Sequence, residues 1–323
     1  MISLDHVWIL PLALILDWLV GDPDAVWRRI PHPVAIIGGF IGWLERVFNR
    51  DDFSSAQRQV LGALSLAVVV LFTAAVGAAL ERLLAAVTYG WIGTAIVAAV
   101  MLAGRSLYDH AAAVGSAFAD GIGAARTAIA RIVGRDPGSL DGPRVARAAI
   151  ESTAENFCDG VVAPAIWFLV LGLPGLFAYK AVNTADSVVG HLTARFTDFG
   201  RAAARVDDLA NLPASRIAGA LIALAAPLGG GSIAAAFRTM RTDAPKHRSP
   251  NAGWSEAAMA GALGIALAGP RRYAGIIVND PYLNDGGRRD VGPADIGRAL
   301  RIYLGANGFL FVAVALPALA LLI

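Results

Sequence analysis

The chain has 323 residues, of which 56% are hydrophobic and only 16% are charged, and its mean hydropathy is +0.59. An ordinary soluble domain carries about 25% charged residues, so this composition excludes a soluble globular protein and predicts an integral membrane protein. The formal net charge of +2 does not favour nucleic-acid binding, and the single cysteine, Cys158, excludes both an internal disulfide and a paired-cysteine metal site.

The first half of the chain contains three apolar segments typical of membrane helices, at 5–20, 60–87 and 92–104. The first lacks a basic leader and a small-residue cleavage site, so we expect it to remain as an anchor. The other two form a hairpin whose turn is uncharged, whereas Arg58 and Arg105 lie at its opposite ends. Because basic residues mark the cytoplasmic side, the polar regions 21–59 and 105–160 are predicted to be cytoplasmic.

The second half contains two interrupted apolar segments, 161–179 and 214–237, and an unbroken one at 302–323. The sequences LGLPGL and APLGGGS divide the first two into halves too short to span a bilayer. Each is therefore either a kinked crossing or a re-entrant hairpin. We favour re-entrant segments, since irregular backbone at membrane depth is tolerated where it lines a protein cavity. They would keep 180–213 and 238–301 cytoplasmic.

Helical apolar spacing recurs within the polar regions. IIGGFIGWLERVF predicts an amphipathic helix on the membrane surface, and a short apolar helix is expected from Glu256 to Ala268. The sequence thus predicts one all-α, polytopic integral membrane domain over 1–323, with four or more membrane helices, broken or re-entrant segments and helical cytoplasmic loops. We expect it in the cytoplasmic (inner) membrane, in contact with the lipid bilayer.

Acidic residues recur every four positions at Glu151, Glu155 and Asp159. On a helix they would form one carboxylate stripe, which needs a compensating cation. Oxygen ligands suit Mg²⁺ better than zinc or copper. The competing interpretation is a solvated acidic face balanced by Arg144 and Arg147.

A second polar group follows the first broken segment. Lys180, one of only two lysines, precedes Asn183 and Asp186 by three and six residues, so one helix face would present all three. Lysine is a compact charge suited to a phosphate or an acyl oxygen, although it can also extend to a membrane boundary. The acid-amide arrangement recurs downstream in Asp207, Asp208 and Asn211, followed by Arg216.

Two further polar groups lie outside this stretch. Lys246, His247 and Arg248 precede a turn and a helix start, which favours an anion site or a lipid-contacting loop. Asp22 and His32 lie in a proline-rich loop near the N-terminus, where either a site or a turn explains them. No P-loop or common zinc-protease motif is present.

Read together, these groups resemble a known family. GDP and HPV near the start, ES-x-AEN-x-x-DG, YK-x-x-NT-x-DS, DD-x-x-N and SPN-x-G-x-x-EAAMAGALG are similar, in this order, to the membrane-bound adenosylcobinamide-phosphate synthases of the CobD/CbiB family. Two departures stand out: the usual Asp-Ser-Met reads Asp-Ser-Val at Val188, and Pro-Ala-Arg carries an inserted Ser215 before Arg216.

The resemblance implies a ligase that uses ATP and Mg²⁺ to join the propionate of adenosylcobyric acid to aminopropanol or its O-phosphate. An unactivated carboxylate needs ATP, cations near the phosphates and a base for the attacking ammonium. Other enzymes of cobalamin synthesis are possible partners. On this reading the site residues are catalytic Lys180, Asp186, Glu155 and His247; substrate-binding Asn156, Asn183, Asn211, Arg216, Lys246, Arg248, Asn251, Asp22 and His32; and metal-binding Glu151, Glu155, Asp159 and Asp208.

Two other classes of function remain open. Polar clusters beside broken helices also build the substrate sites of transporters, so a carrier for a small anion or amine is one alternative. A non-enzymatic membrane sensor or scaffold is another. Carriers usually contain repeated halves, and none is visible in this sequence.

Overall fold

The computed structural model describes residues 4–133, 138, 140–191, 193–273 and 276–320. These residues are mostly helical, with only four short strands, which confirms the predicted all-α class. The chain divides into two compact units, which we describe separately: unit 1 comprises 1–103, 163–211 and 314–323, and unit 2 comprises 104–162 and 212–313.

Unit 1 contains α1 (Leu4–Val20), α2 (Asp24–Trp27), α3 (Pro33–Phe48), α4 (Ser55–Ala85), α5 (Gly90–Met101) and α9 (Ala163–Val189). Unit 2 contains α6 (Gly104–Ala117), η1 (Phe118–Asp120), α7 (Ile122–Ile129), α8 (Gly142–Phe157), η2 (Cys158–Val162), η3 (Ala226–Gly229), α11 (Ile233–Asp243), η4 (Ala244–Lys246) and α12 (Ala252–Leu263). Two helices contribute residues to both units, α10 (Arg201–Leu224) and α13 (Pro293–Ala320).

The strands of unit 2 are short and form two antiparallel pairs. They are β1 (Leu267–Ala268) with β4 (Tyr282–Leu283) and β2 (Arg271–Tyr273) with β3 (Ile276–Val278). The predicted helix from Glu256 to Ala268 is therefore wrong at its end, because α12 stops at Leu263. Gly264 there adopts a left-handed conformation (φ 66°), which commonly ends a helix.

Four helical stretches are long and apolar enough to cross a membrane: Ser55–Ala85, Gly90–Asp120, Gly142–Val189 and Pro293–Ala320. They support the predicted membrane protein. Both predicted interruptions are present, since α9 loses helical geometry at Gly172 and η3 separates α10 from α11. Whether each interrupted segment crosses or re-enters the bilayer stays a prediction, as does the cytoplasmic placement of the polar regions.

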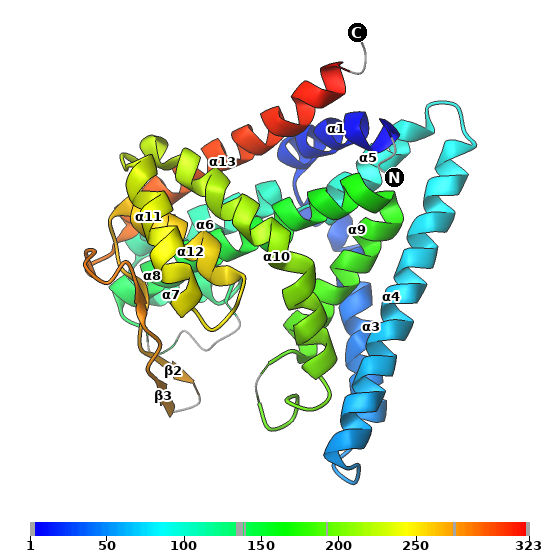
Figure 1. Cartoon of the computed structure of the whole chain (residues 1–323), viewed down its shortest axis with the longest axis horizontal. Helices are drawn as coiled ribbons and strands as arrows, with labels where there is room; N and C mark the ends of the chain where they lie inside the picture. Colours follow the sequence, from blue (N-terminus) through cyan, green and yellow to red (C-terminus); the bar gives the residue numbers. More distant parts are fainter. Residues whose placement is uncertain (1–3, 134–137, 139, 192, 274–275, 321–323) are drawn as a thin grey trace. The chain divides into compact units, whose positions relative to one another are not determined.

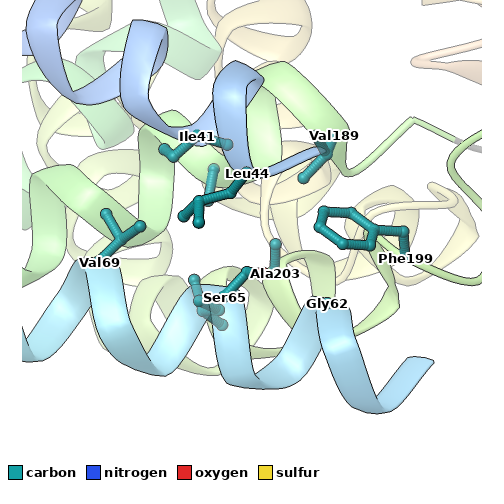
Figure 2. A pocket seen from close by; sticks show the side chains of 10 residues that line it. Ile41, Leu44, Gly62, Ser65, Val69, Val189, Phe199 and Ala203 are labelled. Carbon is teal, nitrogen blue, oxygen red and sulfur yellow. The ribbon is translucent and has the colours of Figure 1, made fainter. Parts of the chain in front are cut away.

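The core of unit 1 forms where α3, α4 and α9 pack together (Figure 1). Apolar spacing along α3 buries Ile37, Ile41 and Leu44 against the other two helices. Figure 2 shows a small hollow in this core, lined by side chains that include Val69 and Phe199. Its volume of about 10 Å³ holds one water at most, so it is a packing defect and not a substrate site.

The break in α9 is bonded to Glu81, which also forms a partly buried hydrogen bond with His6. Gly172 has φ 67° and ψ −151°, a conformation that other residues rarely adopt. Oε2 of Glu81 accepts the backbone N–H of Leu173 at 2.9 Å, and Oε1 lies 2.6 Å from Nε2 of His6. Glu81 thus satisfies a backbone donor exposed by the break, because the irregular turn leaves it without a helical partner.

Replacing Gly172 with alanine is expected to destabilise unit 1. A Cβ there would lie 2.5 Å from both Oε2 of Glu81 and Nε2 of His6, in addition to a backbone strain of about 1–3 kcal/mol. We expect a clearly lower unfolding midpoint in detergent. Gly39→Ala in α3 is the matched control, since no atom lies within 4 Å of its added Cβ. An equal midpoint for the two variants would contradict this account of the break.

The loop between α9 and α10 is fixed by two carboxylates. Asp198 accepts hydrogen bonds from Gln59, Ser55 and Arg58 at the start of α4, and these bonds lower the pKa of Asp198. Glu45 of α3 binds Arg195 through both oxygens, at 2.7 and 2.9 Å. The loop therefore holds the start of α10 against α3 and α4, which positions the polar residues of α10 described next.

Candidate functional site

The polar residues of unit 1 form one buried hydrogen-bonded network. Tyr179 donates to Oδ1 of Asn211 at 2.9 Å, and Nδ2 of Asn211 donates to Oδ2 of Asp207 at 3.0 Å. Nδ2 of Asn183 lies 3.3 Å from the other oxygen of Asp207. Helical spacing explains part of this geometry, since Asp207 and Asn211 are four residues apart on α10.

Asp207 is the most perturbed acid of this network. It is 7% exposed, and burial together with the nearby negative charge of Asp186 raises the pKa of Asp207 to about 7, although the bonds from Asn183 and Asn211 lower it. The carboxyl group of Asp207 can therefore hold a proton near neutral pH and exchange it with a substrate, which is what a general acid or base requires.

The predicted Lys180, Asn183 and Asp186 face lies on the second half of α9, in the same unit. Lys180 is buried, with 8% of its surface exposed, whereas Asn183 and Asp186 are partly exposed. Asp208 is also partly exposed, and burial raises the pKa of its carboxyl group. Unit 1 therefore combines a buried ammonium group, two amides and three carboxyl groups.

The predicted carboxylate stripe of unit 2 is not a regular α-helical face. Glu151 and Glu155 lie on α8, but Asp159 lies in η2, a π-helix, whose wider turn changes the four-residue register. Glu151 is buried and its Oε1 accepts the backbone N–H of Ala268 at 2.7 Å, which gives it a structural role. Glu155 is exposed, and the side-chain amide of Asn156 donates to Ser152.

The carboxylates of the described residues do not by themselves form a magnesium site. Among the described residues, no three histidine, cysteine, aspartate or glutamate side chains converge in a way that could hold a metal ion. A resident metal cage is thus not evident in that part of the chain. Mg²⁺ commonly binds through one or two carboxylates together with substrate phosphates, so the expected magnesium stays a prediction.

In unit 2, Arg216 forms a hydrogen bond with Asn251 and a cation–π contact with Trp254. Its Nη1 donates to Oδ1 of Asn251 at 3.1 Å, and its guanidinium lies 4.6 Å from the ring centroid of Trp254. Oγ of the fully buried Ser215 also donates to Asn251, at 3.1 Å. The predicted residues Arg216 and Asn251 are therefore brought together, although 35 positions separate them in sequence.

His247 contacts an acid that sequence reasoning did not select. Its Nδ1 accepts the backbone N–H of Ser249 at 3.1 Å, so a neutral ring carries its proton on Nε2. Nε2 lies 3.7 Å from Oε2 of Glu256, which is 2% exposed. These two contacts fix the orientation of the imidazole ring, with Nε2 directed toward Glu256.

The other predicted basic and N-terminal residues have structural contacts. Lys246 forms a 2.6 Å ion pair with Asp243. Burial alone would raise the pKa of Asp243, but the hydrogen bonds from Lys246 and from the backbone N–H of Asn284 bring it below its usual value. Arg248 is exposed. In unit 1, Nδ1 of His32 caps α3 at Val34, its Nε2 bonds the carbonyl of Val100 at 3.1 Å, and Asp22 lies 3.9 Å away.

Several contact residues were missed from the sequence. In the sequence, Asp207 stands out only as one of two consecutive aspartates, and Glu256 only as the first residue of a predicted helix. Tyr179, Ser215 and Trp254 carried no signal of their own, because their roles depend on partners more than 30 residues away. The four-residue spacing from Asp207 to Asn211 is the one sequence signal that could have identified Asp207.

Comparison with known proteins places the chain in a family. The family profile described as CobD/Cbib protein matches residues 10–303. The chain belongs to the CobD/Cbib family. Among curated members of the CobD/Cbib family, the proteins named cobalamin biosynthesis protein CobD from Rhizobium meliloti (strain 1021) and Brucella suis biovar 1 are 46% and 49% identical to it. These alignments cover 98% and 91% of this chain and 99% and 91% of the relatives. No solved structure matches it.

Proposed function

We propose that this CobD/Cbib family member is an enzyme of cobalamin biosynthesis that forms an amide bond at the expense of ATP. The amide joins a corrinoid propionate, that of adenosylcobyric acid, to aminopropanol or its O-phosphate. The names of the curated relatives support the pathway. The observation that carries the chemistry is the Asp207 network, whose carboxyl group exchanges a proton near pH 7.

The reaction needs two steps, and the second includes a proton transfer that this network suits. A carboxylate oxygen attacks the terminal phosphorus of ATP, the bond to ADP breaks, and an acyl phosphate forms. The ammonium then loses a proton, and the free amine attacks the carbonyl carbon and expels phosphate. The proton passes to the carboxylate of Asp207, since only a deprotonated amine is a nucleophile.

The remaining predicted residues take electrostatic roles in this proposal. In unit 1, Lys180 stabilises negative charge on the transferred phosphoryl group or the acyl oxygen. In unit 2, taken by itself, Arg216 is positioned by Asn251 as an anion-binding group. Magnesium enters as the nucleotide complex and neutralises phosphate charge when bound. We place these groups on the cytoplasmic side of the inner membrane, where ATP is available.

An assay of product formation tests this function. Purified protein in detergent is incubated with ATP, Mg²⁺, adenosylcobyric acid and aminopropanol phosphate, and the amide is detected by mass spectrometry. We expect product only when all four are present. Chelation of magnesium should abolish it. Absence of product in the complete mixture, with uptake of the amine into proteoliposomes, would replace the enzyme with the carrier alternative.

A further inference from the structure

A hollow unrelated to the family motifs lies in unit 2 between α6 and α7. It has a volume of about 300 Å³, within the lower range of small-molecule pockets. His110 and Ala113 line it from α6, and Ala124, Thr127 and Ala128 line it from α7, with Arg131 just beyond the helix end. The three alanines create the space, and the three polar side chains supply possible ligand contacts.

The orientation of the His110 ring is fixed by its own helix. Nδ1 lies 2.7 Å from the carbonyl oxygen of Ser106, and a carbonyl can only accept, so Nδ1 carries a proton. Nε2 is therefore the ring nitrogen left to interact with a ligand, because no described residue forms a hydrogen bond with it.

Arg131 is anchored at the other side of the hollow. Its backbone N–H donates to Ala128 at 3.3 Å, and the carbonyl of the next residue, Ile132, accepts from Ser152 at 2.9 Å. Within the described ranges Arg131 forms no ion pair, whereas the acid on α6, Asp109, is bound by Arg105. Among the described residues, no carboxylate is paired with the guanidinium of Arg131, which brings a positive charge to the hollow.

We propose that the hollow between α6 and α7 binds a small phosphate group, either inorganic phosphate or a phosphate monoester. The guanidinium of Arg131 matches two phosphate oxygens, and the hydroxyl of Thr127, now bonded to Gly123 at 3.0 Å, rotates to donate to a third. Nε2 of His110 can accept a hydrogen bond from the P–OH group of a phosphate monoanion, because Nδ1 already donates to Ser106. Binding needs no turnover, so it does not depend on the ligase function.

Calorimetric titration of the purified full chain tests this site. The probes are inorganic phosphate and O-phosphoethanolamine, with ethanolamine as the control that lacks phosphate. Binding of the monoester alone would identify an aminoalkyl phosphate site, and equal binding of both probes would identify a simple phosphate site. We expect Arg131→Ala to weaken binding by about 10- to 100-fold, since a charge-assisted hydrogen bond is lost.

Matched variants separate binding at this hollow from binding elsewhere. Arg131→Lys should retain part of the affinity, and Ala124→Leu should abolish binding by filling the space while leaving every charge in place. Arg105→Ala removes an arginine of α6 that does not line the hollow, so it should bind phosphate like the wild type. Lys180→Ala should also bind normally even where ligation is lost. Unchanged affinity in both Arg131→Ala and Ala124→Leu, or no phosphate-dependent heat, would overturn the proposal.

Discussion

Replacing Asp207 with asparagine is expected to reduce the rate of ligation at neutral pH by roughly 100-fold or more, the usual contribution of a general base. Asparagine is nearly isosteric and can still bond Asn183, but it cannot take a proton from the amine. The measurement is the rate of amide formation between pH 6 and pH 9. The wild-type rate should rise as pH increases through about 7, where Asp207 loses its proton, and the variant should lack that rise.

Asp52→Asn is the control for this experiment. Asp52 is exposed, with its pKa lowered by the hydrogen bond from Arg50, so its loss should leave the rate unchanged. A pH profile of Asp207→Asn that matches the wild type would contradict the role of Asp207 as a proton acceptor.

The same carboxyl group makes stability depend on pH. Folding raises the pKa of Asp207 to about 7, from about 4 in an unfolded chain. The folded protein therefore binds more protons between these values, and the free energy of unfolding contributed by Asp207 falls as pH rises from about 4 to 7. Groups such as Asp198, with a lowered pKa, act in the opposite direction. The denaturation midpoint is therefore measured at pH 5 and at pH 8. The wild type should lose more stability between these two pH values than Asp207→Asn does, and an identical change in both proteins would exclude this effect.

Replacing Lys180 with alanine is expected to abolish measurable ligation while membrane insertion is retained. Lys180 is 8% exposed, and a buried ammonium group stabilises developing negative charge far more strongly than an exposed one. Lys180→Met, which keeps the length of the side chain, should be equally inactive. Arg50→Ala removes an exposed cation from a polar loop and should retain full activity.

Lys180→Arg distinguishes charge from shape. Arginine preserves the charge but is bulkier and planar, so we expect partial activity if charge dominates. Full activity in Lys180→Met would remove Lys180 from the mechanism, because no charge would then be needed at that position.

Local sequence patterns predicted the helices well. Apolar runs identified the membrane-length helices, and LGLPGL and APLGGGS located both interruptions, because glycine and proline act on the backbone within a few residues. The end of α12 was missed, since Ile265 to Ala268 is as apolar as the helix before it. Only the left-handed backbone at Gly264 ends that helix, and the strand depends on its partner at Tyr282 and Leu283.

The sequence indicated which polar residues to consider for the candidate site, but not which of them bond to one another. The motifs included Asn183, Asn211, Arg216 and Asn251, each of which forms a polar contact in the structure, while their role in substrate binding stays a prediction. They did not show that Glu151 is bonded to a strand backbone or that Lys246 is paired with Asp243. They also gave no indication that the pKa of Asp207 would be raised, because its burial and the nearby charge of Asp186 depend on how α9 and α10 meet.

Activation of the corrinoid carboxylate by ATP is the central claim, and oxygen-isotope transfer tests it most directly. The substrate is adenosylcobyric acid with ¹⁸O in the reacting carboxylate, incubated with the purified protein, MgATP and aminopropanol phosphate. An acyl phosphate intermediate requires one ¹⁸O atom to leave with the inorganic phosphate for each amide formed, which mass spectrometry of the phosphate detects. Amide formation without any ¹⁸O in the phosphate would contradict the acyl phosphate mechanism.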